Sequence, residues 1–148
     1  MKTVFDKATE DELISRINSL SESSTTEWGK MNVHQMMNHC IMVEEMFLGK
    51  TTYSRTFLGR LIGKMALKGM LKDEAPMMRN APTHPSFKMG NIAGDLAAEK
   101  KKWAGLVKEY QKFSSPEFMH WFFGRMTKEQ MGQFAYKHTD HHLRQFGA

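Results

Sequence analysis

The segment YKHTDHHLRQF, residues 136–146, has a strong helical pattern and carries three of the seven histidines of the chain. His138 and His142 are four residues apart, so on an α-helix both imidazoles project from one face and can reach a common point. Inside a helical bundle, the natural occupant of such a point is a divalent metal ion. A third ligand from another helix would complete the site, and His39 is the candidate.

The composition of the chain favours a helical globular protein. The chain has 148 residues, of which 41% are hydrophobic and 25% are charged. This is enough for one domain, residues 1–148, with a hydrophobic core. There are four prolines, and no run alternates strictly between apolar and polar residues as exposed strands do. We therefore expect an all-α fold.

The cysteine content and the hydropathy pattern indicate where the protein resides. Cys40 is the one cysteine, so no internal disulfide or CxxC zinc site can form, and a reducing compartment is suitable. The first residues show no apolar stretch of signal-peptide length. No segment approaches the ~20 apolar residues that a membrane span requires. We expect a cytoplasmic protein without a membrane span.

Capping signals and helical periodicity place five helices. Thr9 with Glu12, and Thr127 with Gln130, have the spacing of a capping box, and Asn32 is a good N-cap. The expected helices are one that starts at Thr9 and four more at about 32–48, 54–71, 95–113 and 127–146. The loop after the third helix holds Pro76, Pro82 and Pro85. These elements predict a four-helix bundle with an additional short helix between the second and third bundle helices.

The faces of two helices decide which histidines point inward. At ~100° per residue, the apolar residues that share a face with His39 are Met36, Met42, Val43 and Met46. His34 lies on the other side and is expected to be solvated. The residues that share a face with His138 and His142 are Met131, Phe134, Ala135 and Gln145, whereas Lys137, Asp140 and Arg144 lie opposite. Two helices thus turn histidines toward the core.

Each of these histidines also has a structural interpretation. A single core histidine is usually neutral and bonded to a backbone carbonyl, and an HxxxH pair without a glutamate between its histidines is common by chance. Three core-facing histidines would each need a separate partner, whereas one metal ion satisfies all three. His141 lies at the edge of the face, either behind the ligands or against solvent, and we favour solvent. Because Asp140 points away, backbone carbonyls are the expected acceptors that orient the ligands.

Three longer segments carry a resemblance to a known family. They are WGKMNVHQMMNHC (28–40), APTHPSF (81–87) and HWFFGRMTKEQMGQFAYKHTDHHLRQFG (120–147). The last contains H-x-x-H-H-x-x-Q, which resembles the signature helix of the DinB/YfiT-like superfamily of bacterial four-helix proteins, and the segments are similar to a subfamily of unknown function. The resemblance implies metal ligation by His39, His138 and His142. Trp121 departs from the pattern, since proline is expected in that turn, but this position lies in a loop.

The resemblance also implies chemistry. Superfamily members include metal-dependent transferases and isomerases that use low-molecular-weight thiols such as mycothiol or bacillithiol, and metal-dependent hydrolases. All-nitrogen ligation suits zinc first and nickel second, whereas the usual iron site needs a carboxylate. We therefore expect a transferase with a thiol cofactor acting on a small-molecule substrate. The alternatives are a hydrolase and a non-catalytic bundle that binds a metal or a partner, with a homodimer as one arrangement.

The segment 54–72 is strongly basic. It holds five cations and no acidic residue, and the cations are Arg55, Arg60, Lys64, Lys68 and Lys72. A solvated helix face explains this charge most simply. The carboxylates of a thiol cofactor, another anionic substrate, or a membrane surface opposite the apolar residues 57, 58, 61, 62 and 65 are further interpretations. Nucleic-acid binding is not expected, because no recognition motif accompanies the pI of 9.4.

Overall fold

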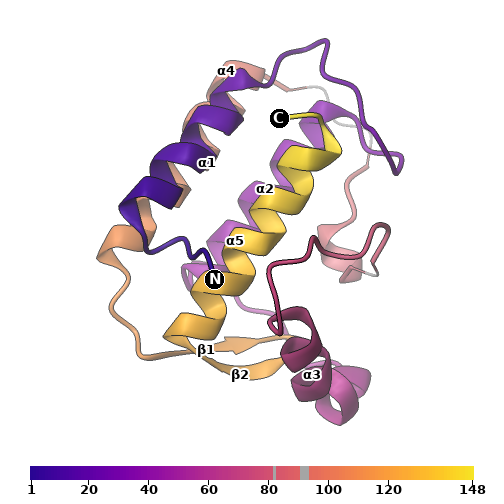
Figure 1. Ribbon diagram of the computed structural model, residues 1–148. Helices are drawn as coiled ribbons and strands as arrows, with labels where there is room; N and C mark the ends of the chain where they lie inside the picture. Colours follow the sequence, from indigo (N-terminus) through magenta and orange to yellow (C-terminus); the bar gives the residue numbers. More distant parts are fainter. Residues whose placement is uncertain (82, 91–93) are drawn as a thin grey trace.

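Four helices lie side by side in the computed structural model, which describes residues 1–81, 83–90 and 94–148 (Figure 1). They are α1 (Lys7–Ser19), α2 (Val33–Phe47), α4 (Leu96–Glu109) and α5 (Lys128–Gln145). Helix α2 contacts α4 and α5, and α1 contacts the same two helices. The four therefore close around one shared apolar core, which includes Phe47, Trp103 and Met131, all with no exposed surface.

The caps of the two histidine-bearing helices form as predicted. The side chain of Asn32 accepts from the backbone of Gln35 and the Gln35 side chain accepts in return, and Thr127 and Gln130 do the same at the start of α5. Helix α1 begins earlier than expected. Its N-cap is Asp6, whose carboxylate accepts from the amide of Thr9, so the predicted first residue lies inside the helix.

The all-α prediction is wrong, because the described residues also contain a two-stranded antiparallel sheet. Strands β1 (Glu117–His120) and β2 (Gly124–Thr127) pair with His120 opposite Gly124. The molecule is therefore a mixed α/β domain. Each strand has four residues, which is too short for apolar–polar alternation to be recognised against the helical pattern around it.

The turn between the strands is built around a buried histidine. His120 is 4% exposed, and its Nδ1 accepts from the backbone amides of Phe122 and Phe123. Gly124 follows with φ = 79°, a left-handed conformation that glycine adopts without strain. Trp121, at the position where the family resemblance leads us to expect proline, lies in this turn, and its ring packs on His84 and His120.

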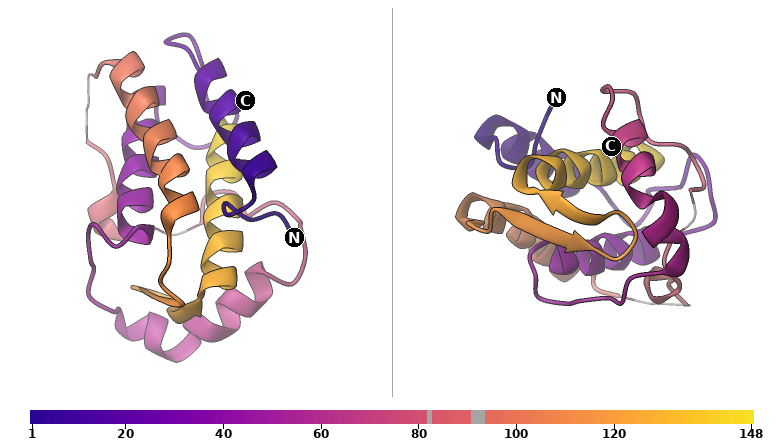
Figure 2. Two further views of the ribbon diagram at one scale, coloured as in Figure 1. Left: turned by 90° about the vertical axis from the view of Figure 1, so that its left-hand side faces the viewer. Right: turned by 90° about the horizontal axis from the view of Figure 1, so that it is seen from below.

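Helix α3 (Phe57–Met70) lies across one end of the other four helices, next to the hairpin (Figure 2). It has 14 residues, as many as α4, so the prediction that the inserted helix is short is wrong. A Cβ atom at Gly59 or Gly63 would stand 2.5 or 2.1 Å from the carbonyl oxygen of Phe122. These two glycines are therefore what permits the close contact between α3 and the turn. Of the loop that follows, Pro76 lies in irregular chain, Pro85 begins the short 3₁₀ helix η1 (Pro85–Phe87), and Pro82 lies outside the described residues. Among the described residues, the structure contains no helix that could span a lipid bilayer.

Candidate metal centre

The three histidines named from the sequence come together in the structure. His39 projects from α2, and His138 and His142 project from α5. One ring nitrogen of each lies within 4.8 Å of the others. The Nε2 atoms of His39 and His138 are 3.3 Å apart, and the ring of His142 is centred 4.7 Å from each of the other two rings. The cluster can hold a metal ion, and the role of these residues as ligands remains a prediction.

Two of the rings are held in a defined orientation. The Nδ1–H of His39 donates to the carbonyl oxygen of Phe87 at 3.1 Å. The Nδ1 of His142 lies 2.9 Å from Oε1 of Gln145, while Nε2 of Gln145 donates to the carbonyl of Trp28 at 2.7 Å. Because the Trp28 carbonyl can only accept, the Gln145 oxygen must face His142. Both imidazoles therefore carry their proton on Nδ1, which leaves the Nε2 lone pair free for a metal ion.

His138 is the member of the cluster whose polar atoms are least satisfied. Its Nδ1 is buried and has no hydrogen-bond partner among the described residues. Its Nε2 faces the Nε2 of His39. The proton of the His39 ring is on Nδ1, which donates to the Phe87 carbonyl. Without a metal ion, a proton on Nε2 of His138 makes this contact a hydrogen bond; a cation bound between the nitrogens would take the place of that proton. The donor set of three neighbouring imidazoles therefore fits a bound cation.

Burial keeps the three rings neutral. Burial lowers the pKa of His142 to about 3, with the neighbouring His39 as the next cause. Burial also lowers the pKa of His39, and it lowers the pKa of His138 well below the ordinary value, with added repulsion from the surrounding imidazoles. Neutral imidazole is the form that binds metal. The cluster is thus in its metal-binding state at neutral pH without proton release from the rings.

The same pKa values predict that the metal-free protein loses stability in acid. The pKa of buried His120 is also about 3, whereas an unfolded histidine titrates near 6.5. Between these values the unfolded chain binds more protons than the folded one, so the free energy of unfolding falls as pH drops below about 6.5. We expect urea unfolding with a chelator present to show lower stability at pH 5 than at pH 7.5.

The variant His120→Asn tests whether the low pKa values of buried histidines cause the loss of stability in acid. Asparagine keeps an acceptor for the two turn amides but does not titrate, so the decline of stability with pH should become shallower. The pKa of His34 is shifted in the opposite direction, because its hydrogen bond to Glu99 raises it. A wild-type unfolding free energy that is constant from pH 7.5 to pH 5 would contradict the neutral, buried state of these rings.

The orientation of the cluster was predicted only in part. The backbone acceptor expected for the ligands is found for His39, in the Phe87 carbonyl. The side-chain acceptor of His142 was missed, although Gln145 lies on the predicted face three residues further along α5. Asp140 is directed elsewhere as expected, and it accepts from Arg16 at 2.7 Å and from Arg144 at 2.8 Å.

Aromatic rings enclose the cluster. Phe87 meets His39 edge to face, with ring centres 6.1 Å apart, and Phe47 and Phe134 each lie 6.5 Å from His138. Such apolar walls limit access of water and strengthen the electrostatic effect of a bound ion.

The other candidate groups have structural roles. His34 was expected to be solvated, but it is partly buried between Glu99 and Glu22, at 2.8 and 2.9 Å. His141 is also partly buried, against the ring of Trp28. Cys40 is buried, and burial raises the pKa of its thiol well above the usual range, so it is not a reactive nucleophile.

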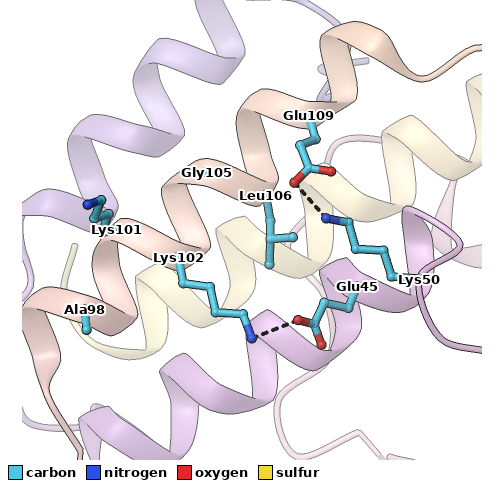
Figure 3. A pocket seen from close by; sticks show the side chains of 8 residues that line it. All are labelled: Glu45, Lys50, Ala98, Lys101, Lys102, Gly105, Leu106 and Glu109. Atoms are coloured by element: carbon cyan, nitrogen blue, oxygen red, sulfur yellow. Dashed lines mark hydrogen bonds and ion pairs between the residues drawn. The ribbon is translucent and has the colours of Figure 1, made fainter.

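A surface groove between α2 and α4 is not a competing candidate for a metal or catalytic site. Figure 3 shows that two ion pairs bridge it, Glu45 with Lys102 and Lys50 with Glu109, both at 2.8 Å. Its lining contains no histidine. Exposed pairs of this kind contribute little to stability and carry no chemistry of their own.

Comparison with known proteins identifies one matching family. The model of a family described as "Protein of unknown function (DUF1569)" matches residues 4–148, so the chain belongs to this family. No match was found among curated proteins or among solved structures.

Proposed function

We propose that this member of the DUF1569 family is a metal-dependent transferase that uses a low-molecular-weight thiol at the three-histidine centre. The observation that carries the proposal is the pair of anchored rings, His39 on the Phe87 carbonyl and His142 on Gln145. Both present a free Nε2 lone pair toward His138. Zinc is the first choice of ion and nickel the second, because the donors are all nitrogen.

The chemistry follows from the charge of the ligand set. A divalent ion held by three neutral imidazoles keeps its full positive charge and lowers the pKa of a thiol or water that binds it. In the proposed transfer, the thiol sulfur forms a bond to an electrophilic carbon of the substrate. The leaving group departs with the bonding electron pair, and the thiol proton passes to solvent. His39, His138 and His142 would hold the ion, and the surrounding phenylalanines would limit the access of water to the reacting atoms.

No free carboxylate lies beside the cluster in the described part of the chain, which favours a thiol over water as the nucleophile. The candidate ligand group found in the described residues contains no carboxylate. The buried carboxyls of the two histidine-bearing helices are engaged elsewhere. Glu44 accepts from the hydroxyls of Tyr110 and Thr139, and Asp140 is bound to two arginines. Water bound to such an ion would keep a pKa near 7 and be only partly ionised at neutral pH, so a nearby base that orients it would help a hydrolase. A thiol starts from a pKa of about 8.5, so the same ion would ionise it fully without a base.

Cobalt substitution tests the proposal without knowledge of the substrate. Untagged protein loaded with Co²⁺ is titrated with N-acetylcysteine and with bacillithiol, and its visible absorption is recorded. We expect a new sulfur-to-cobalt charge-transfer band in wild-type protein and in the control variant His34→Ala, but not in His142→Ala. Turnover of an electrophile such as 1-chloro-2,4-dinitrobenzene should then require added thiol. A cobalt-loaded protein that gives no such band, or that hydrolyses p-nitrophenyl acetate equally well without thiol, would contradict the transferase proposal.

A further inference from the structure

The exposed apolar side chains of the protein are concentrated on α3. Eight large apolar residues are exposed in the described part of the chain, and five of them belong to this one helix. They are Phe57 (78% exposed), Leu58 (56%), Leu61 (67%), Ile62 (37%) and Met65 (71%). Water-exposed apolar patches of this kind mark a surface that binds a partner or a membrane.

The five side chains form a single stripe that faces away from the protein. Positions 57, 61 and 65 follow each other at one-turn spacing, and 58 and 62 lie beside them. The opposite side of α3 holds Gly59, Gly63 and Leu67, which are buried. Because the two glycines lie against the Phe122 carbonyl, the helix cannot rotate its apolar stripe inward without losing this contact.

A row of cations borders the apolar stripe. Arg60, Lys64 and Lys68 are spaced four residues apart, so they follow one flank of the helix between its buried side and its apolar stripe. No acidic residue occurs between positions 54 and 72. Lys64 also donates to the carbonyl of Arg125 on β2, which helps to fix α3 on the hairpin.

We propose that α3 binds the surface of a membrane that contains anionic phospholipids. An amphipathic helix with cations along its flank lies in the plane of the interface, with its apolar stripe among the acyl chains and its cations at the phosphates. The position of α3 suits this arrangement, because it lies across one end of the other four helices, where it can meet a flat surface (Figure 2). Each cation near such a surface adds to the electrostatic attraction.

Charge favours a membrane over a second copy of the chain. Pairing two α3 stripes would bring two rows of cations together, and the segment 54–72 supplies no carboxylate to balance them. An anionic bilayer offers the opposite charge and an apolar interior at once. The proposed contact is a surface contact, consistent with the lack of any helix suited to span a bilayer in the described residues.

Vesicle co-sedimentation of the full untagged chain tests the proposal. We expect binding to phosphatidylcholine vesicles that contain phosphatidylserine, weak binding to phosphatidylcholine alone, and weaker binding as salt is added. The double variant Arg60→Glu/Lys68→Glu should bind at least about tenfold more weakly. Its matched control is Lys101→Glu/Lys108→Glu on α4, which changes the net charge equally at exposed positions.

Apolar variants separate insertion from simple charge attraction. Met65→Ser should weaken vesicle binding, whereas Met78→Ser, at a methionine of similar exposure in the loop after α3, should not. All these side chains are exposed, so the variants should keep the wild-type circular dichroism spectrum and melting temperature. Equal binding to neutral and anionic vesicles, or no binding to either, would overturn the proposal. A dimer in analytical ultracentrifugation that Met65→Ser abolishes, without vesicle binding, would instead assign the stripe to a second copy.

Discussion

Alanine in place of His142 is expected to lower the affinity for zinc by more than about 100-fold. Loss of a residue that merely orients a ligand typically costs about 10–100-fold, and here a proposed ligand itself is removed. Gln145→Leu should fall within that smaller range, because it removes the acceptor that fixes the His142 ring. Competition with a chromogenic chelator, on untagged protein, measures these affinities.

The control for this series is a histidine outside the cluster. His34 lies on the same helix as His39 but is bonded to Glu99 and Glu22, so His34→Ala should bind zinc as tightly as the wild type. Because His142 is buried, His39→Ala is included as a second ligand variant, and both are checked for a cooperative unfolding transition. Wild-type affinity in folded His142→Ala or His39→Ala would remove these residues from the site.

Phe47→Ala is expected to destabilise the protein by about 3–5 kcal/mol, the usual cost of removing a buried phenylalanine ring. Phe47 has no exposed surface. Its ring lies 5.6 Å from Phe118 on β1, 5.8 Å from Phe134 on α5 and 6.5 Å from His138. The substitution therefore opens a cavity where α2, the hairpin and the histidine cluster meet. Urea unfolding of the metal-free protein gives the change in unfolding free energy.

Phe57→Ala is the matched control, because Phe57 is 78% exposed on α3. The same deletion of a ring at that position should change stability by no more than about 0.5 kcal/mol. If the two variants lost similar stability, the packing of Phe47 between the helices and the hairpin would be contradicted.

The proximity of the three histidines could be predicted because it depends on local signals. Asn32 and Thr127 each form a capping box with a glutamine three residues further along. This spacing can be recognised in the sequence, so the start of each helix is predictable. Once the helices are placed, a period of ~3.6 residues assigns the faces of His39, His138 and His142.

The remaining features depend on contacts between distant parts of the chain. The hairpin consists of two strands of four residues each, and its turn is stabilised by the buried ring of His120 rather than by a recognisable turn sequence. The Phe87 carbonyl that orients His39 lies 48 residues further along the chain. No periodicity within α2 carries information about such a partner.

Helix α5 shows why a single polar face can mislead. Lys137 and Asp140 lie opposite the histidines, yet both are only 7% exposed. Lys137 donates to the carbonyls of Met70 and Asp73, and Asp140 accepts from Arg16 of α1. The helix is covered on both sides, so its charged residues are buried with partners that a sequence pattern does not reveal.

The metal content of the untagged protein tests the central claim most directly. Elemental analysis after zinc loading and dialysis should find about one zinc ion per chain in the wild type and none in His39→Ala or His138→Ala. That result would establish a site shared by α2 and α5. A folded wild-type protein that retains no zinc, and no nickel when that ion is supplied instead, would show that the three histidines are core residues. That result would contradict both the metal site and the proposed transferase.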